Sequence, residues 1–163
     1  DTYHASIGQG FVLATPIQLA AATAVVANGG TLWKPRVVGQ IRSRQGEAQS
    51  VAPEALRRNV IDPSILKTVR EGMRMTVTES VGTAQSLASL PVAVAGKTGT
   101  AQFGSEKKTH GWFESFAPYE NPTIAMVVLV EGQENEGYFA VPVTKEVLAW
   151  YFSEGKGNHR EEK

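Results

Sequence analysis

Three strand-like segments follow one another between residues 92 and 131, and this succession constrains the fold more than any other feature of the sequence. Residues 92–95, 112–117 and 123–131 are rich in the β-branched and aromatic residues that favour strands. Only the short Pro- and Asn-containing segment 118–122 joins the last two, and such a segment suits a tight turn. We therefore predict that these two strands pair antiparallel.

Helix patterns flank the strand region on both sides. Thr15, Pro16 and Gln18 form a capping-box pattern before the Ala-rich residues 19–27. Asp62 and Pro63 likewise begin a helix that we expect to run to about residue 79. The apolar face expected on this helix consists of Leu66, Val69, Met73 and Val77.

A closing helix is predicted from Pro142, with an apolar face of Val143, Val147, Leu148, Tyr151 and Phe152. Helices, three strands and a last helix indicate an α+β fold with antiparallel strands flanked by helices.

Between the first two helices, the pattern predicts a β-hairpin or extended arm. Asn28, Gly29 and Gly30 supply residues that tolerate left-handed conformations and so end the first helix. Residues 31–41 are β-rich, and residues 44–47 have the composition of a turn.

Composition excludes several classes of function. The 163 residues carry 16 basic and 16 acidic side chains, so no net charge favours nucleic acid as a partner. The absence of cysteine excludes disulfides and thiolate metal sites. His4, His110 and His159 lie far apart without carboxylates at ligand spacing, so we predict no metal site and no cofactor. The longest apolar runs, such as residues 124–130, are much shorter than the roughly 20 residues of a membrane span.

A strand that carries Lys97, Thr98, Gly99 and Thr100 suits the binding of a carboxylate-terminated acyl donor. The Lys97 ammonium attracts an anion, and the two threonine hydroxyls can donate to it. Gly99 lets the strand edge approach a peptide closely, and the backbone N–H of Thr100 can point at a developing oxyanion.

These residues and four further segments resemble the transpeptidase domain of penicillin-binding proteins. Residues 95–102, Ala-Gly-Lys-Thr-Gly-Thr-Ala-Gln, are similar to the third active-site motif of that family. The further segments, in the family's order, are residues 6–10, residues 14–20, Gly82-Thr83-Ala84, and residues 110–113 with 116–118. The resemblance covers nearly the whole chain and is closest to class B enzymes of the elongation type, penicillin-binding protein 2.

The resemblance implies a β-lactamase/transpeptidase-like fold and a serine D,D-transpeptidase. In that reaction a serine attacks the D-Ala-D-Ala bond of a peptidoglycan stem peptide, and β-lactam antibiotics mimic this donor. Lys97, Thr98, Thr100 and Gln102 are the implied substrate-binding residues, and Thr100 provides the oxyanion-hole N–H. The resemblance also implies other cell-wall elongation proteins as partners, and an inner-membrane protein whose domain faces the periplasm.

Two active-site motifs of the family are not found within residues 1–163. The nucleophile belongs to a Ser-x-x-Lys motif, and Ser64 with Lys67 matches it only as a string, within the helix that precedes the third motif. No Ser-x-Asn occurs, and Asn121 falls in the predicted turn. We therefore expect residues 1–153 to be the C-terminal half of a transpeptidase domain, inactive without its N-terminal half, and residues 154–163 to be a flexible polar tail.

Other interpretations remain open. Gly96-Lys97-Thr98 resembles the end of a phosphate-binding loop, but Pro91 stands where that loop needs glycine. Trp112, Phe113 and Phe116 suit core packing better than a stacking platform for bases or sugars. The chain can also belong to a non-catalytic module that binds peptidoglycan or a partner, or to a serine β-lactamase or β-lactam sensor that shares the third motif.

Overall fold

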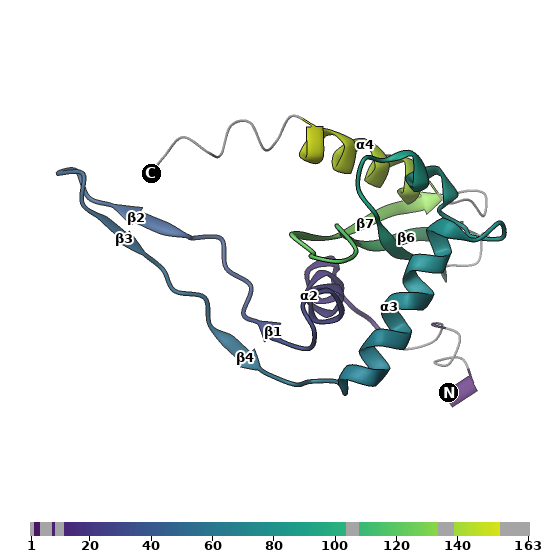
Figure 1. Cartoon of the computed structure of the whole chain (residues 1–163), viewed down its shortest axis with the longest axis horizontal. Coiled ribbons are helices and arrows are strands. Elements are labelled where there is room, and N and C mark those ends of the chain that lie inside the picture. Colours follow the sequence, from purple (N-terminus) through teal and green to yellow (C-terminus); the bar gives the residue numbers. More distant parts are fainter. Residues whose placement is uncertain (1, 4–7, 9–11, 104–107, 134–138, 154–163) are drawn as a thin grey trace.

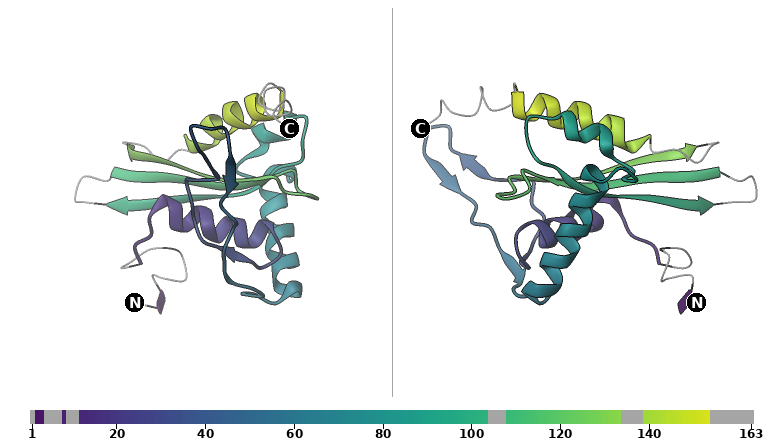
Figure 2. Two further views of the ribbon diagram at one scale, coloured as in Figure 1. Left: turned by 90° about the vertical axis from the view of Figure 1, so that its left-hand side faces the viewer. Right: turned by 45° about the vertical axis from the view of Figure 1, so that its right-hand side comes forward.

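A three-stranded antiparallel sheet lies between helices on both of its faces (Figures 1 and 2). The computed structural model describes residues 2–3, 8, 12–103, 108–133 and 139–153. The sheet has the order β5–β6–β7, with bounds β5 Ala95–Phe103, β6 Lys108–Ala117 and β7 Ile124–Gln133. In Figure 2 the helix α2, Pro16–Ala27, lies against one face, and α4, Ala140–Ser153, lies against the other.

The predicted antiparallel pairing of the last two strands is confirmed, and β5 also pairs antiparallel with β6, but the strand bounds differ from the predicted ones. β5 begins at Ala95, where the predicted strand 92–95 ends, because residues 93 and 94 are bonded to other elements. The carbonyl of Ala93 accepts from the N–H of Tyr119 at 2.8 Å, and the carbonyl of Val94 accepts from Arg74 Nη1 at 2.6 Å. β6 already begins at Lys108, four residues before the predicted start. The Lys-Thr-Gly-Thr motif therefore lies within a strand.

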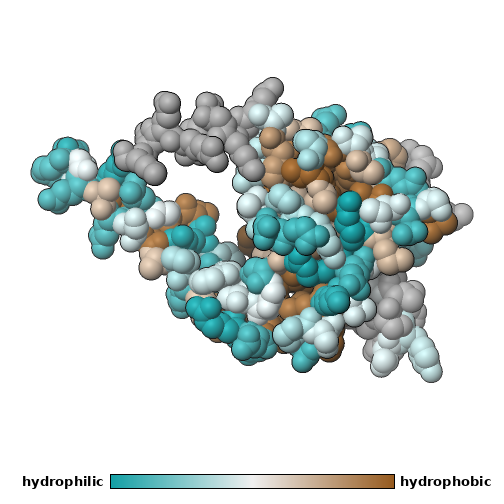
Figure 3. All heavy atoms as spheres, viewed as in Figure 1, coloured by the Kyte–Doolittle hydropathy of each residue, from teal (hydrophilic) through white to brown (hydrophobic). Residues whose placement is uncertain are grey.

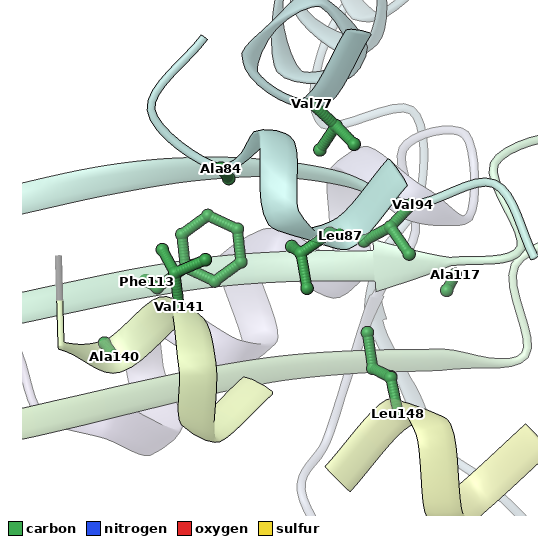
Figure 4. Packing of buried hydrophobic residues seen from close by; sticks show 9 residues of the cluster. All are labelled: Val77, Ala84, Leu87, Val94, Phe113, Ala117, Ala140, Val141 and Leu148. Carbon is green, nitrogen blue, oxygen red and sulfur yellow. The ribbon is translucent and has the colours of Figure 1, made fainter. Parts of the chain in front are cut away.

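The main core fills the space between the sheet, α4 and the short 3-10 helix η1, Gln85–Ser89 (Figure 4). Phe113 is fully buried at its centre and is surrounded by apolar side chains, including Leu87 of η1 and Leu148 of α4. Phe116 packs in a second cluster, with Ala27 of α2. Residues 113 and 116 therefore face opposite sides of the strand. Their predicted place in the core is confirmed, whereas Trp112 is only half-buried.

The capping signals of the first two helices are confirmed. The Thr15 hydroxyl accepts from the N–H of Gln18, and the Gln18 side chain accepts from the N–H of Thr15. Asp62 caps α3, Pro63–Thr78, with one bond, because its side chain accepts from the N–H of Ser64. Gly29 and Gly30 have positive φ as expected, but Asn28 does not.

Two of the predicted apolar faces are only partly buried. On α3, Leu66, Met73 and Val77 are buried, but Val69 is exposed because it faces a cavity beside α2. On α4, which begins two residues before Pro142, Leu148 is buried while Val143 and Val147 are exposed. The residues that bury α4 are instead Ala140, Val141, Thr144 and Leu148.

The predicted arm projects away from the sheet (Figure 1). It consists of two short antiparallel pairs, β1 Leu32–Trp33 with β4 Ala55–Arg57, and β2 Gln40–Arg42 with β3 Ala48–Ser50. The turn at its tip has Gly46 at φ +89°, as its composition predicts. The β-rich stretch 31–41 is divided because residues 34–39, which include Pro35, are not part of a strand.

In the part of the chain that the structure describes, no helix has the length and apolar character needed to span a bilayer. The predicted polar tail at 154–163, His4 and His159 lie outside the described residues, as does all but Gly8 of the segment 6–10.

Candidate functional site

The motif strand β5 lies at the edge of the sheet. Among the described residues its only strand partner is β6, with Lys97 opposite Glu114 and Thr100 opposite Gly111. An antiparallel strand directs alternate backbone N–H and C=O groups to either side. On the side away from β6, these groups of β5 have no strand partner within the described ranges, so the edge can receive an extended peptide.

Lys97 faces the same side of the sheet as α2. Its cross-strand neighbour Glu114 accepts a hydrogen bond from the hydroxyl of Thr23, a residue of α2, at 3.0 Å. Lys97 and Glu114 both line a cavity of about 560 Å³. The remaining wall is largely apolar and comes from α2 and α3, with Val26 and Met73 among its residues. A positive and a negative side chain therefore share one side of a cavity whose remaining wall is largely apolar.

The Lys97 ammonium stays accessible within this arrangement. The residue is exposed, and its Nζ donates to the carbonyl of Thr98 at 2.5 Å. An ammonium has three protons, so this bond leaves donors for an anion. Lys97 is thus exposed and lines the cavity.

Thr98 faces the opposite side of the sheet. Its cross-strand neighbour is Phe113, at the centre of the α4-side core, and Thr98 is only 8% exposed. Its hydroxyl lies 2.9 Å from the hydroxyl of Thr83. The structure therefore directs the side chains of Lys97 and Thr98 to different faces of the edge strand, and the Thr98 hydroxyl already has a protein partner.

The two glycines of the motif region differ in their surroundings. A Cβ on Gly96 would overlap the ring of Phe113, so packing inside the sheet requires glycine there. A Cβ on Gly99 would meet only the Cβ of Trp112, at 3.4 Å, which is close to an ordinary contact. Internal packing therefore does not account for Gly99, and this residue is available for close approach from outside the sheet.

Thr100 and Gln102 lie further along β5. By alternation they share the face of Thr98, where Thr100 is half-buried and Gln102 is exposed. The five predicted site residues are thus brought together on one strand, with Lys97 and Gly99 on one face and Thr98, Thr100 and Gln102 on the other.

Two contacts of this region were not foreseen from the sequence. The Thr83–Thr98 bond joins residues 15 positions apart, and the Thr23–Glu114 bond joins residues 91 apart. The only signal for either was indirect: Gly82-Thr83-Ala84 belongs to the resemblance, and Glu114 is a charged residue in a strand that is otherwise largely apolar.

The string Ser64…Lys67 has structural roles. Ser64 Oγ donates to Asp62 Oδ1 at 2.5 Å as part of the helix cap, and Lys67 Nζ lies 3.9 Å from Glu71 Oε1 on the helix surface. Asn121 lies in the turn between β6 and β7, as predicted. His110 Nδ1 accepts from the N–H of Gly132. The described residues contain no group of three or more His, Asp or Glu side chains placed to hold a metal ion.

An antiparallel sheet between helical layers, with a Lys-Thr-Gly-Thr edge strand beside a cavity, is the architecture of the β-lactamase/transpeptidase-like fold. The model of the penicillin-binding protein transpeptidase domain matches residues 1–149. The chain belongs to this family.

Relatives and solved structures agree with this assignment. The chain is 29% identical to peptidoglycan D,D-transpeptidase MrdA of Haemophilus influenzae, over 94% of this chain and 26% of the relative. Penicillin-binding protein A of M. tuberculosis, solved as an imipenem acyl-enzyme, is 32% identical with a TM-score of 0.76, over 88% of this chain and 32% of that one. PBP2 of Helicobacter pylori, solved in complex with MreC, is 29% identical with a TM-score of 0.69. The match covers 93% of this chain and 27% of that one. The chain thus spans about a quarter to a third of the length of these proteins.

Proposed function

We propose that this chain is the substrate-holding part of a peptidoglycan D,D-transpeptidase, and that it works with a serine outside residues 1–163. The observation that carries the proposal is the position of Lys97, which is accessible on an edge strand and lines the cavity between α2, α3 and the sheet. The names of the relatives support the activity: MrdA is a peptidoglycan D,D-transpeptidase, and penicillin-binding protein A forms an acyl-enzyme with imipenem.

Each motif residue has a task in this proposal. The substrate peptide lies along the open edge of β5, where Gly99 permits close contact. Lys97 supplies positive charge next to the reacting serine and the substrate anion. Thr98, Thr100 and Gln102 donate hydrogen bonds, and the backbone N–H of Thr100 stabilises the oxyanion of the tetrahedral intermediate. After loss of the terminal D-Ala, an amine of a neighbouring strand resolves the acyl-enzyme.

The proposal extends to location and partners. By analogy with the relatives, the chain belongs to a cell-wall enzyme at the bacterial inner membrane, and its residues face the periplasm. The complex of H. pylori PBP2 with MreC suggests that other elongation proteins bind the complete polypeptide.

Covalent labelling with a fluorescent penicillin tests the proposal. We expect the complete transpeptidase domain to be labelled and residues 1–163 alone not to be. Replacing Lys97 with Ala in the complete domain should slow labelling about 100-fold, the scale seen when one electrostatic contact to a developing charge is removed. The matched control is Lys67→Ala, which removes an exposed lysine of α3 and should leave labelling unchanged.

Four outcomes would contradict the proposal. Labelling of residues 1–163 alone, abolished by Ser64→Ala, would place the nucleophile within this chain. Binding of a D-Ala-D-Ala peptide by the complete domain without any acylation would favour a non-catalytic binding module. Rapid release of hydrolysed penicillin would favour a β-lactamase, and slow release without transpeptidation would favour a sensor.

A further inference from the structure

The turn Gly82-Thr83-Ala84 belongs to the family resemblance but has no part in the proposed reaction so far. In the structure it brings one hydroxyl against the motif strand, because Thr83 Oγ1 lies 2.9 Å from Thr98 Oγ1. Thr83 is half-buried and Thr98 is 8% exposed, so water competes little for this bond.

The turn is fastened to the end of α3. The N–H of Gly82 donates to the carbonyl of Glu79 at 2.9 Å, and the N–H of Ala84 donates to the carbonyl of Thr76 at 3.1 Å. A Cβ on Gly82 would overlap the Thr76 carbonyl oxygen, and Ala84 is buried in the core. These contacts fix the backbone on both sides of Thr83, so its hydroxyl is held in place and does not belong to a freely moving loop.

The other partner is fixed by separate contacts. Arg74 of α3 donates to the carbonyl of Val94 at 2.6 Å, immediately before β5 begins. Gly96 packs directly under the ring of Phe113. Arg74 thus ties α3 to the residue before β5, and the turn after α3 brings Thr83 to Thr98.

The proton count of this pair limits what Thr98 can do. A hydroxyl has one proton to donate and two lone pairs that accept. The geometry of the bond allows either threonine to be the donor. If Thr98 donates to Thr83, no proton remains for a substrate. If Thr83 donates to Thr98, the Thr98 proton is available to an anion. The bond that the Thr98 oxygen accepts from Thr83 also polarises the Thr98 O–H group and makes it a stronger donor.

We infer that Thr83 is a positioning residue for the substrate carboxylate: it donates to Thr98 and so directs the Thr98 proton to the anion. The inference rests on the proposed function, in which the edge of β5 binds a carboxylate-terminated peptide. The Thr83 hydroxyl then acts through Thr98, and its effect depends on the charge of the ligand.

The test compares benzylpenicillin with its methyl ester, in which the carboxylate is neutral, on the complete transpeptidase domain. We expect Thr83→Val to lower the second-order acylation rate constant for benzylpenicillin about tenfold, the equivalent of one modest hydrogen bond. The rate constant for the ester should change by less than about twofold. Thr83→Ser retains the hydroxyl and should restore the acid-to-ester ratio. The ratio does not depend on the fraction of folded enzyme, because both compounds are measured on one preparation.

A double variant separates positioning from a general structural role. If Thr83 acts through Thr98, then Thr83→Val in a Thr98→Val background should cause no further loss of the acid-to-ester ratio. An equal loss on acid and ester, an unchanged acid rate in Thr83→Val, or additive losses in the double variant would each overturn the inference. If the unsubstituted domain reacts with neither compound, the proposed function itself fails.

Discussion

The sheet and the arm contain similar β-forming residues, yet they differ in what holds them together. Side chains of β6 such as Phe113 are completely buried between helices. In the arm every residue of β2 and β3 is exposed, and Val37 is as accessible as in an extended chain. Figure 3 shows mainly hydrophilic residues towards the tip of the arm. The sheet is therefore stabilised by burial of apolar surface, whereas the arm depends on its turn and on backbone pairing, which is marginal for two strands alone.

Truncating one apolar side chain in each region tests this difference most strongly. We expect Phe113→Ala to lower the free energy of unfolding by about 4 kcal/mol, because it opens a cavity in the α4-side core. Val37→Ala should change it by less than about 0.5 kcal/mol. Urea denaturation of both variants measures the difference. A loss above about 1 kcal/mol for Val37→Ala would mean that the arm packs against another part of the protein.

Replacing Gly96 and Gly99 with alanine separates two roles of the sheet, because Gly96 serves packing in the core whereas Gly99 faces the proposed substrate. We expect Gly96→Ala to destabilise the fold by about 3 kcal/mol, because its Cβ would collide with the Phe113 ring and the Glu114 carbonyl. Gly99→Ala should leave the urea midpoint almost unchanged and instead slow acylation by penicillin. Equal destabilisation by the two substitutions would contradict the separate roles of the two glycines.

Arg70 links the layers at the end of the sheet nearest the arm. Its guanidinium donates to the carbonyls of Val26 and Ala27 at the end of α2 and to that of Tyr119, and it lies over the ring of Phe116. We expect Arg70→Met to lower the free energy of unfolding by about 2 kcal/mol, because three carbonyls lose a charged donor while the apolar contact is largely kept. The control Lys67→Met, on the exposed side of α3, should have almost no effect. If urea denaturation gives the same free energy of unfolding for both variants, the hydrogen bonds of the Arg70 guanidinium contribute nothing measurable to stability.

Features that depend on neighbouring residues were predicted well from the sequence. The capping box at Thr15, the cap at Asp62 and the glycine turn of the arm each involve groups within a few positions of one another. The order of the sheet strands and the edge position of the motif strand also agree with the sequence, because the strand patterns are consecutive and the motif directly follows the first of them.

Features that depend on contacts between distant residues were predicted poorly. Periodicity alone suggested that Val69, Val143 and Val147 are buried, but the faces that meet the sheet are set by helix orientation, which a pattern does not contain. The same limit applies to the site. Lys97 and Thr98 were expected to act side by side on an anion, and nothing local revealed that Thr98 bonds to Thr83 on the other face.

The smallest expected effect concerns Asp62, where the arm joins α3. The hydroxyl of Ser64, and then its backbone N–H, donate to Asp62 and lower the pKa of this carboxyl below its usual value of 3.8. A group with a lowered folded-state pKa stabilises the fold fully above its unfolded pKa, and this contribution disappears as the pH falls through the folded value. The variant Asp62→Asn keeps an acceptor for the cap but does not titrate.

We therefore compare the melting temperatures of the native chain and of Asp62→Asn across this pH range. The native chain should melt at a slightly higher temperature at neutral pH, because the charged carboxylate accepts more strongly than a neutral amide. This difference should shrink as the pH falls below the usual pKa of an aspartate, because the carboxyl then takes up a proton. A difference that stays constant on acidification would show that the charge of Asp62 contributes nothing, and that the junction between arm and helix is held by the neutral cap alone.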